Sequence, residues 1–180
     1  MPQRRSFDAD VAFRGRDLVR LGLDGHRWGC PWPSRAARRR LDAVIAAVGA
    51  TDYADAPLGR LSGGEQQRLR IAQALVGEPA LLLCDEPLVS LDLAHQRAVV
   101  DLIDARRRAA GTAVVFVTHE LNLVLPVVDR VLYLAGGRWA VGRPDEIMTS
   151  QTLSELYGTE IDVLRVRGRI VVVGAPEPVA

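Results

Sequence analysis

From Phe7 to about Val76, apolar residues recur three or four positions apart, which places them on one face of a helix. A Pro- and Trp-containing stretch at residues 30–33 and the pair Ala56-Pro57 interrupt this pattern. We therefore predict a helical subdomain over residues 4–77. The apolar positions that carry it most clearly are Leu18, Leu21, Leu41, Val44, Ile45 and Val48.

From Ala80 onward, short continuous apolar runs alternate with helical patterns. Ala80 to Cys84 and Ala113 to Val117 are predicted strands, separated by a predicted helix from Leu93 to Arg108. Unbroken apolar runs of this length are typical of parallel strands covered on both faces. The order strand, helix, strand predicts a β-α-β unit. It forms the centre of an α/β core that we place at residues 78–158.

Two β-hairpins are predicted in the last third of the chain, each around a glycine turn. Gly136-Gly137 supplies the positive φ that the first turn needs, and Gly168 marks the second turn. The expected strands are 130–134 with 139–141, and 162–166 with 170–173; short helices are expected near 120–124 and, as one continuous helix, from Asp145 to Tyr157. The second hairpin belongs to a predicted C-terminal segment of residues 159–180.

Composition narrows the class of protein. The chain has 180 residues, 48% of them apolar, with 23 basic and 22 acidic side chains and a net charge of +1. This near balance gives no basic field for nucleic acid, so no nucleic-acid partner is expected, and the Arg clusters are predicted to be solvated helix faces. The apolar runs are too short to span a bilayer, and the first residues do not resemble a secretory signal. A cytoplasmic location is therefore expected.

The first candidate for chemistry is the octamer Leu61-Ser62-Gly63-Gly64-Glu65-Gln66-Gln67-Arg68. Ser62 followed three residues later by Glu65 is a capping box, which by itself indicates only a well-capped helix. Two glycines in the first turn each weaken a helix by roughly 1 kcal/mol relative to Ala. They become useful if an anion approaches the bare backbone, so the octamer predicts a phosphate site at a helix N-terminus.

Acidic and imidazole side chains follow the two predicted parallel strands. Asp85 and Glu86 end the first, where one acid can hold Mg²⁺ and the other can polarise an attacking water. Taken alone, they are better explained as the end of a strand and a turn before Pro87. His119 follows the second strand and can donate to a phosphate oxygen. Asp92, at the start of the next helix, is by itself explained as an N-cap.

Four motifs taken together resemble, in order and spacing, the ATP-binding cassette (ABC) ATPases. They are residues 61–68, 81–87, 90–92 and 118–119. The resemblance covers almost the whole chain. It implies an α/β fold in which the parallel sheet of a P-loop NTPase core is combined with an α-helical subdomain and C-terminal β-hairpins. It also implies ATP and Mg²⁺ as cofactors and the hydrolysis of ATP to ADP and phosphate as the reaction.

The resemblance assigns residues to an interface between two subunits. Ser62, Gly63, Gly64 and Glu65 are similar to the signature loop, which closes on the γ-phosphate of an ATP held by a second nucleotide-binding subunit. Asp92 is similar to the D-loop aspartate of the dimer interface. The implied partners are that second subunit and the permease subunits in the membrane. The implied location is therefore the cytoplasmic face of the cell membrane, held there through the permease.

The remaining roles concern hydrolysis. By resemblance, Asp85 is the Walker B aspartate that holds Mg²⁺, Glu86 is the catalytic base and His119 is the switch histidine. Gln3 resembles the Q-loop glutamine, which senses Mg²⁺ and the attacking water.

The chain departs from the family in one large respect. It contains no Lys, and no Gly-rich loop precedes residue 61, so the Walker A lysine that reaches the β- and γ-phosphates is absent. The resemblance then implies an incomplete core, whose missing strand, loop and helix belong before Met1. We expect negligible hydrolysis by the isolated chain, and apolar surface exposed around Leu81 to Cys84.

The end of the chain narrows the branch of the family. Leu153 to Gly158 and the hairpin after it resemble the ATPase subunits of zinc, manganese and iron-type metal importers. Two alternatives stay open. One is a soluble ABC protein of DNA repair or translation, although the insertions of that class are not seen. The other is a non-hydrolysing or vestigial chain that supplies only its signature loop to a complete partner.

Overall fold

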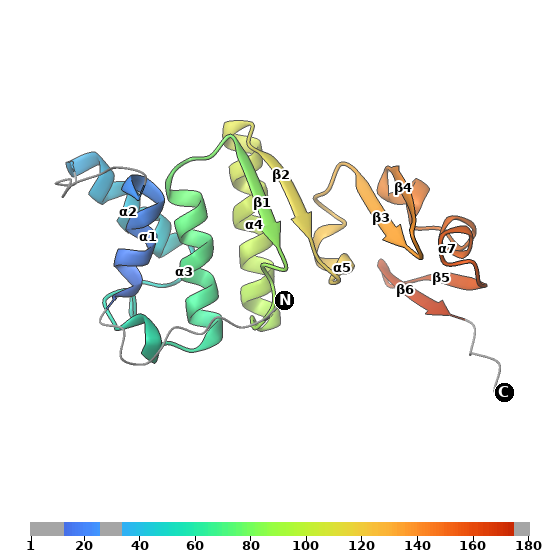
Figure 1. Ribbon diagram of the computed structural model, residues 1–180, viewed down its shortest axis with the longest axis horizontal. Helices are drawn as coiled ribbons and strands as arrows, with labels where there is room; N and C mark the ends of the chain where they lie inside the picture. The colour runs from blue at the N-terminus through green and yellow to red at the C-terminus, as the bar shows by residue number, and fades with distance from the viewer. Residues whose placement is uncertain (1–12, 26–33, 175–180) are drawn as a thin grey trace. The chain divides into compact units, whose positions relative to one another are not determined.

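The computed structural model describes residues 13–25 and 34–174, which fall into two compact units (Figure 1). The first unit extends to His119 and the second begins at Glu120. Each unit is described below by itself. Gln3 and the Trp- and Pro-containing stretch at residues 30–33 lie outside the described residues.

Helices form the early part of the first unit, as the periodicity predicts. They are α1 (Gly15–Asp24), α2 (Arg35–Ala47), α3 (Gly63–Val76) and the short 3₁₀ turn η1 (Leu58–Arg60). Helix α1 packs directly on α3 (Figure 1), and a Cβ at Gly22 would lie 2.1 Å from the carbonyl oxygen of Gln73. Val19, Ile45, Leu58 and Leu69 are buried here, whereas Leu21 is 46% exposed although its spacing predicts a core position.

The predicted β-α-β unit is confirmed in the second half of the same unit. Strand β1 (Leu81–Asp85) pairs in parallel with β2 (Ala113–Val117), and α4 (Leu93–Ala110) connects them. One face of this pair is covered, since Leu82 is only 5% exposed. Its other face is bare: Leu81 and Leu83 are 53% and 70% exposed, as expected, and Val115 and Val117 on β2 are exposed with them.

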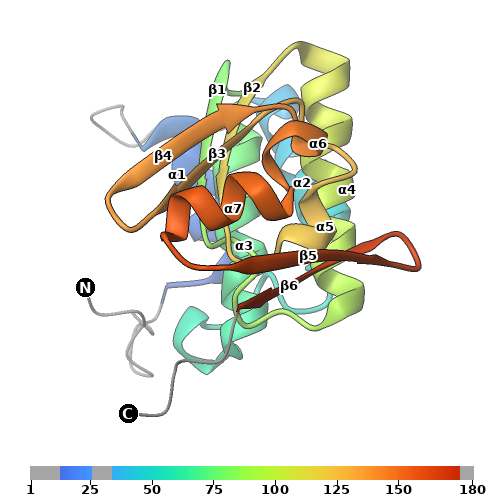
Figure 2. The same cartoon turned by 90° about the vertical axis from the view of Figure 1, so that its right-hand side faces the viewer.

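The second unit consists of two antiparallel hairpins and short helices around one apolar core. Figure 2 shows α7 beside both hairpins. Gly136 and Gly137 turn the first hairpin with φ values of 55° and 75°, as predicted. The elements are α5 (Leu121–Val124), β3 (Val131–Ala135), β4 (Arg138–Gly142), α6 (Pro144–Ile147), α7 (Ser150–Tyr157), β5 (Ile161–Val166) and β6 (Arg169–Gly174). The core includes Ile147, Met148, Leu153, Leu156, Ile161 and Ile170.

The prediction of one helix from Asp145 to Tyr157 is wrong. The chain leaves the helical conformation at Met148, whose ψ is 61° and whose side chain is 1% exposed in the core. Helix α7 then begins anew with Thr149 as N-cap, since the Thr149 hydroxyl accepts a hydrogen bond from the N–H of Thr152. Burial of Met148 therefore accounts for the break.

Side chains tie the last hairpin to the rest of the second unit. The amide of Asn122 donates to the carbonyl of Ile170 at 2.9 Å and accepts from its N–H at 2.7 Å. Ser150 accepts from the N–H of Val163, and Ser154 accepts from the N–H of Ile161. These bonds pair backbone groups at the outer edges of the hairpin. None of the helices in the described part of the chain is long and apolar enough to cross a membrane.

Candidate functional site

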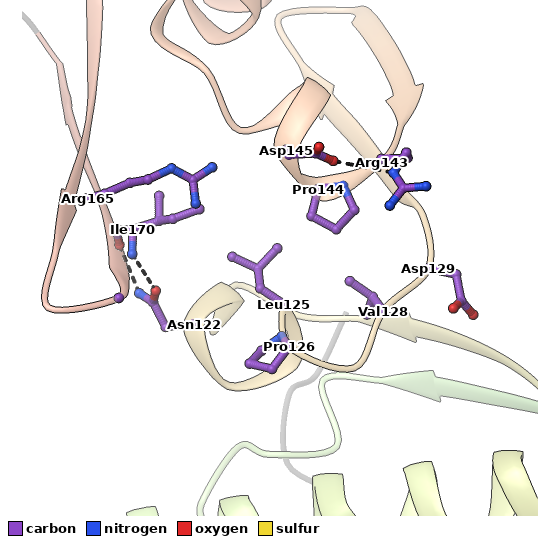
Figure 3. Close-up of a pocket in the computed structure, with 11 residues that line it drawn as sticks. Asn122, Leu125, Pro126, Val128, Asp129, Arg143, Pro144, Asp145, Arg165 and Ile170 are labelled. Carbon is purple, nitrogen blue, oxygen red and sulfur yellow. Dashed lines mark hydrogen bonds and ion pairs between the residues drawn. The ribbon is translucent and has the colours of Figure 1, made fainter.

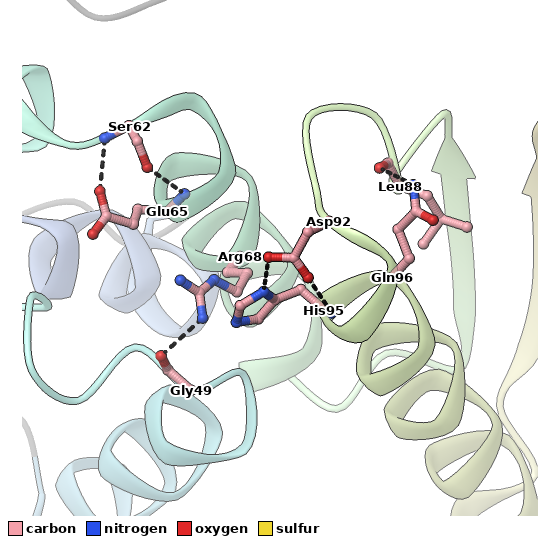
Figure 4. A network of polar contacts seen from close by, with 8 residues as sticks. All are labelled: Gly49, Ser62, Glu65, Arg68, Leu88, Asp92, His95 and Gln96. Carbon is pink, nitrogen blue, oxygen red and sulfur yellow. Dashed lines mark hydrogen bonds and ion pairs between the residues drawn. The ribbon is translucent and has the colours of Figure 1, made fainter.

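The signature octamer forms the start of α3, and Ser62 is its N-cap (Figure 4). The predicted capping box is present. The N–H of Ser62 donates to Glu65 Oε2 at 2.7 Å, and the N–H of Glu65 donates to Ser62 Oγ at 3.3 Å. The hydroxyl and then the N–H of Ser62 lower the pKa of Glu65. The loop therefore enters the helix in one defined conformation, with the first-turn N–H groups directed outward from the helix end.

This pKa shift predicts a pH-dependent stability. A carboxylate with a lowered pKa in the folded state stabilises the fold above its unfolded pKa and loses this effect as pH falls through the folded pKa. Glu65→Gln should therefore cost about 0.3–1 kcal/mol at pH 7. This difference from the wild type should shrink as the pH falls below about 4.3, the ordinary pKa of a glutamate side chain. Urea unfolding at pH 7 and in acid measures it, and a difference that grows in acid would contradict the assignment.

The two glycines of the loop have different surroundings. A Cβ at Gly64 would lie 2.9 Å from the carbonyl oxygen of Ser90, which is closer than real Cβ contacts. A Cβ at Gly63 would lie 3.8 Å from the Cβ of Ser90, an ordinary contact. Packing inside the chain therefore requires glycine at position 64, but it does not explain glycine at position 63. Glycine at position 63 is explained if a ligand approaches the backbone there.

Glu86 and His119 are brought together at the ends of the two parallel strands. Asp85 is the last residue of β1 and stands opposite Val117 in the pairing. The N–H of Glu86 extends that pairing by donating to the carbonyl of Val117 at 2.9 Å. His119 Nδ1 lies 3.0 Å from Glu86 Oε1. Glu86 Oε2 is buried and has no hydrogen-bond partner among the described residues, so an acceptor oxygen is left over at this strand end.

The chain from Glu86 to Leu91, called here the Glu86–Leu91 loop, connects β1 to α4. Two of its residues have left-handed backbone conformations, with φ of 48° at Glu86 and 69° at Ser90. Two glutamine side chains contact it: Gln67 Nε2 donates to the carbonyl of Pro87 at 3.0 Å, and Gln96 Nε2 donates to that of Leu88 at 3.3 Å. The sequence pattern assigned no role to either glutamine. Only the place of Gln67 inside the octamer hinted at one.

Asp92 is the N-cap of α4, as the alternative explanation for it predicted. Its Oδ1 accepts from the N–H of His95 at 2.9 Å, and its Oδ2 lies 2.6 Å from His95 Nδ1 (Figure 4). The backbone N–H of His95, followed by its ring, lowers the pKa of Asp92. The motifs assign no role to His95, and the structure shows it as the partner of Asp92. The spacing of three residues from an N-cap was the available signal.

The two side chains predicted to hold Mg²⁺ are Asp85 and Gln3. Asp85 is exposed at the end of β1. Gln3 lies outside the described residues. Within residues 13–25 and 34–174, no group of three or more His, Cys, Asp or Glu side chains has an arrangement that could hold a metal ion. The predicted Mg²⁺ ligands therefore stay a prediction.

The second unit contains a cavity of about 530 Å³ (Figure 3). Asn122, Leu125, Pro126 and Ile170 line it together with two arginines, Arg143 and Arg165. Arg143 is paired with Asp145 at 3.6 Å. None of the residues that the motifs single out lines this cavity, so we do not assign the predicted chemistry to it.

Comparison with known proteins points to one family. The sequence model described as "ABC transporter" matches residues 2–89. The hemin import ATP-binding protein HmuV of Bradyrhizobium diazoefficiens is 43% identical over 142 residues, which are 73% of this chain and 51% of that protein. The zinc import ATP-binding protein ZnuC of Halorhodospira halophila is 35% identical, over 89% of this chain and 58% of that protein. The chain thus spans a little over half the length of these relatives.

Solved structures agree with the sequence relatives. A structure described as a metal-chelate type ABC transporter in an inward-facing conformation matches with a TM-score of 0.76 and 26% identity, over 95% of this chain and 70% of that chain. A dimeric ATP-binding cassette bound to ADP and Pi matches with a TM-score of 0.64 and 27% identity, over 76% and 60% of the two chains. These structures confirm the predicted fold class. Together, the fold, the motifs and the sequence relatives show that the chain belongs to the ABC transporter family of ATP-binding proteins.

Proposed function

We propose that this chain is the ATP-binding and ATP-hydrolysing subunit of an ABC importer for a metal ion or a metal chelate. The observation that carries the proposal is the contact between Glu86 and His119 at 3.0 Å, beside Asp85, where two parallel strands end. Ligands of open α/β sheets bind at the carboxyl ends of the strands. A base next to a histidine at this edge suits the activation of water for phosphoryl transfer.

Two features of the chain fit a nucleotide with Mg²⁺. The orphaned Glu86 Oε2 can accept a hydrogen bond from the attacking water, and Gly63 leaves the start of α3 open to an anion. When bound, ATP with Mg²⁺ supplies the scissile γ-phosphate and neutralises its charge. In this role Asp85 and Gln3 would hold Mg²⁺, Glu86 would take the proton of water and His119 would donate to a phosphate oxygen.

The names of the relatives support the partners and the substrate class. One relative is called a hemin import and another a zinc import ATP-binding protein. By analogy, this chain works with a second ATP-binding subunit and with permease subunits, at the cytoplasmic face of the membrane. Ser62 to Glu65 and Asp92 then face the partner subunit. Closure of the dimer on ATP drives transport. The subdomain bounds 4–77, 78–158 and 159–180 belong to the same proposal.

A second function is favoured by one observation. The chain contains no Lys, so its own residues include no P-loop lysine for the β- and γ-phosphates. In this alternative the chain does not hydrolyse ATP and only offers its signature loop to a complete partner. Both functions give Ser62 and Gly63 the same role at the partner's ATP, but only the first makes Glu86 a catalytic base.

The role of the signature loop can be tested in a mixture with a complete family member. The hemin import protein of B. diazoefficiens suits this purpose because it is 43% identical over the shared region. Its ATP affinity, measured by fluorescence titration, should rise about tenfold when the wild-type chain is added, a gain of ~1.4 kcal/mol from contacts across the interface. Ser62→Arg should abolish this rise, because a guanidinium fills the space that the phosphate needs.

A matched control adds the same charge elsewhere. Ala43→Arg places an arginine on the exposed side of α2 and should leave the rise in affinity unchanged. If the wild type and Ser62→Arg raise the partner's affinity equally, or if neither does, the loop does not contact ATP across an interface.

A further inference from the structure

Two glutamine side chains from different helices donate to neighbouring carbonyls of the Glu86–Leu91 loop. Gln67, in the second turn of α3, reaches the carbonyl of Pro87 at 3.0 Å. Gln96, near the start of α4, reaches the carbonyl of Leu88 at 3.3 Å, and Figure 4 shows this side chain extending from α4 toward the loop. The loop is thus held from both sides immediately after Glu86.

The two glutamines supplement a loop that has little backbone pairing of its own. Pro87 and Leu88 are buried, so their carbonyls are largely removed from water and require partners. The carbonyl of Leu88 has one backbone donor and takes Gln96 as a second. The N–H of Val89 donates to Glu86 at 3.3 Å and that of Leu91 to Leu88 at 3.2 Å. No N–H of the loop donates to the carbonyl of Pro87, which is left to Gln67.

The backbone at Glu86 has a left-handed conformation that needs support from surrounding contacts. Its φ of 48° is in the left-handed region, which is unfavourable for residues other than glycine. Such conformations occur where surrounding contacts over-determine them. On one side, the N–H of Glu86 is fixed to Val117. On the other side, the two glutamines fix the carbonyls that follow, so the direction of the Glu86 side chain depends on them.

We propose that Gln67 and Gln96 are positioning residues that hold the Glu86–Leu91 loop and so aim the Glu86 carboxylate. The inference rests on the proposed function, because it concerns the same hydrolysis step. Ser62 caps the helix of Gln67, and Asp92 caps the helix of Gln96. Since a helix turn is rigid, a shift of either capped loop against a partner subunit moves the carbonyls that orient Glu86. The pair thereby couples engagement of the partner's ATP to the chain's own base.

The test uses the assembled transporter, purified through a tag on the C-terminus of this chain from cells that carry its gene. Gln67→Met keeps the length and the helix propensity of the side chain and removes the donor. Gln96→Met does the same on the second helix. Each should lower kcat for ATP about tenfold or more and leave KM within about twofold, because misplacing a catalytic group affects the chemical step and not binding. The matched control is Gln73→Met, since Gln73 is on α3 and its side chain makes no hydrogen bond within the described residues.

Hydrogen exchange supplies a second readout that needs no nucleotide. The N–H groups of Val89 and Leu91 should exchange faster in both glutamine variants than in the wild type or Gln73→Met, because the loop opens more often. Lower kcat with faster exchange supports the inference. An unchanged kcat, a rise in KM alone or unchanged exchange overturns it while the proposed function stands. If the wild type hydrolyses ATP no faster than Glu86→Gln, the proposed function fails first and the inference falls with it.

Discussion

Glu86→Gln is expected to lower kcat for ATP hydrolysis by about 10²–10⁴-fold, the usual contribution of a general base. An amide has nearly the same shape as the carboxylate but accepts no proton, so water is no longer activated. Contacts with the bound nucleotide should change little, because Glu86 is assigned to the water and not to the phosphates. Phosphate release by the assembled transporter measures kcat, and a fluorescent ATP analogue measures binding.

The control is a glutamate with no assigned role. Glu160 is exposed just before β5, and Glu160→Gln makes the same change of charge, so its kcat should stay within about twofold of the wild type. Equal losses in both variants would indicate a general effect of charge. If Glu86→Gln hydrolyses ATP as fast as the wild type, Glu86 is not the general base, and the non-hydrolysing alternative is favoured.

Local patterns predicted the order and kinds of elements well. The apolar runs at 80–84 and 113–117 identify β1 and β2, and Gly136-Gly137 identifies the first hairpin, because each signal lies within a few neighbouring residues. The break at Met148 was not predictable in this way. Its cause is the burial of Met148 in a core that also includes Ile161 and Ile170 of the last hairpin, which lie farther along the chain. The exposure of Leu21 was not predictable either, since its helical spacing predicts a core position but the residue is 46% exposed.

The candidate site was predictable only in part. Parallel strands carry their last residues to one edge, so the meeting of Glu86 with His119 follows from the order of the elements. The hydrogen bonds from Gln67 and Gln96 to the Glu86–Leu91 loop have no such signal, because a single glutamine on a helix forms no pattern in the sequence. The left-handed conformation of Ser90 was equally hidden, since serine does not require it.

Substitutions of Gly63 and Gly64 should separate the effect of packing on stability from the effect of ligand binding on ATP affinity. Gly64→Ala should destabilise the fold by about 1–3 kcal/mol, since the new methyl would lie 2.9 Å from the carbonyl of Ser90 and that backbone must move. The same movement displaces the start of α3, so the partner's gain in ATP affinity should be lost as well. Urea unfolding of the chain and the fluorescence titration with the complete family member measure the two effects.

Gly63→Ala is the matched variant, because the same methyl group meets nothing closer than 3.8 Å. Its fold should be as stable as the wild type or up to about 1 kcal/mol more stable, since Ala favours a helix over Gly. The gain in ATP affinity should nevertheless fall, because the methyl occupies the approach to the bare backbone. A Gly63→Ala chain that is stable and raises the partner's affinity as well as the wild type would mean that no anion approaches α3 there. Glycine at position 63 would then have no ligand-based explanation, and the role of the signature loop would rest on Ser62 alone.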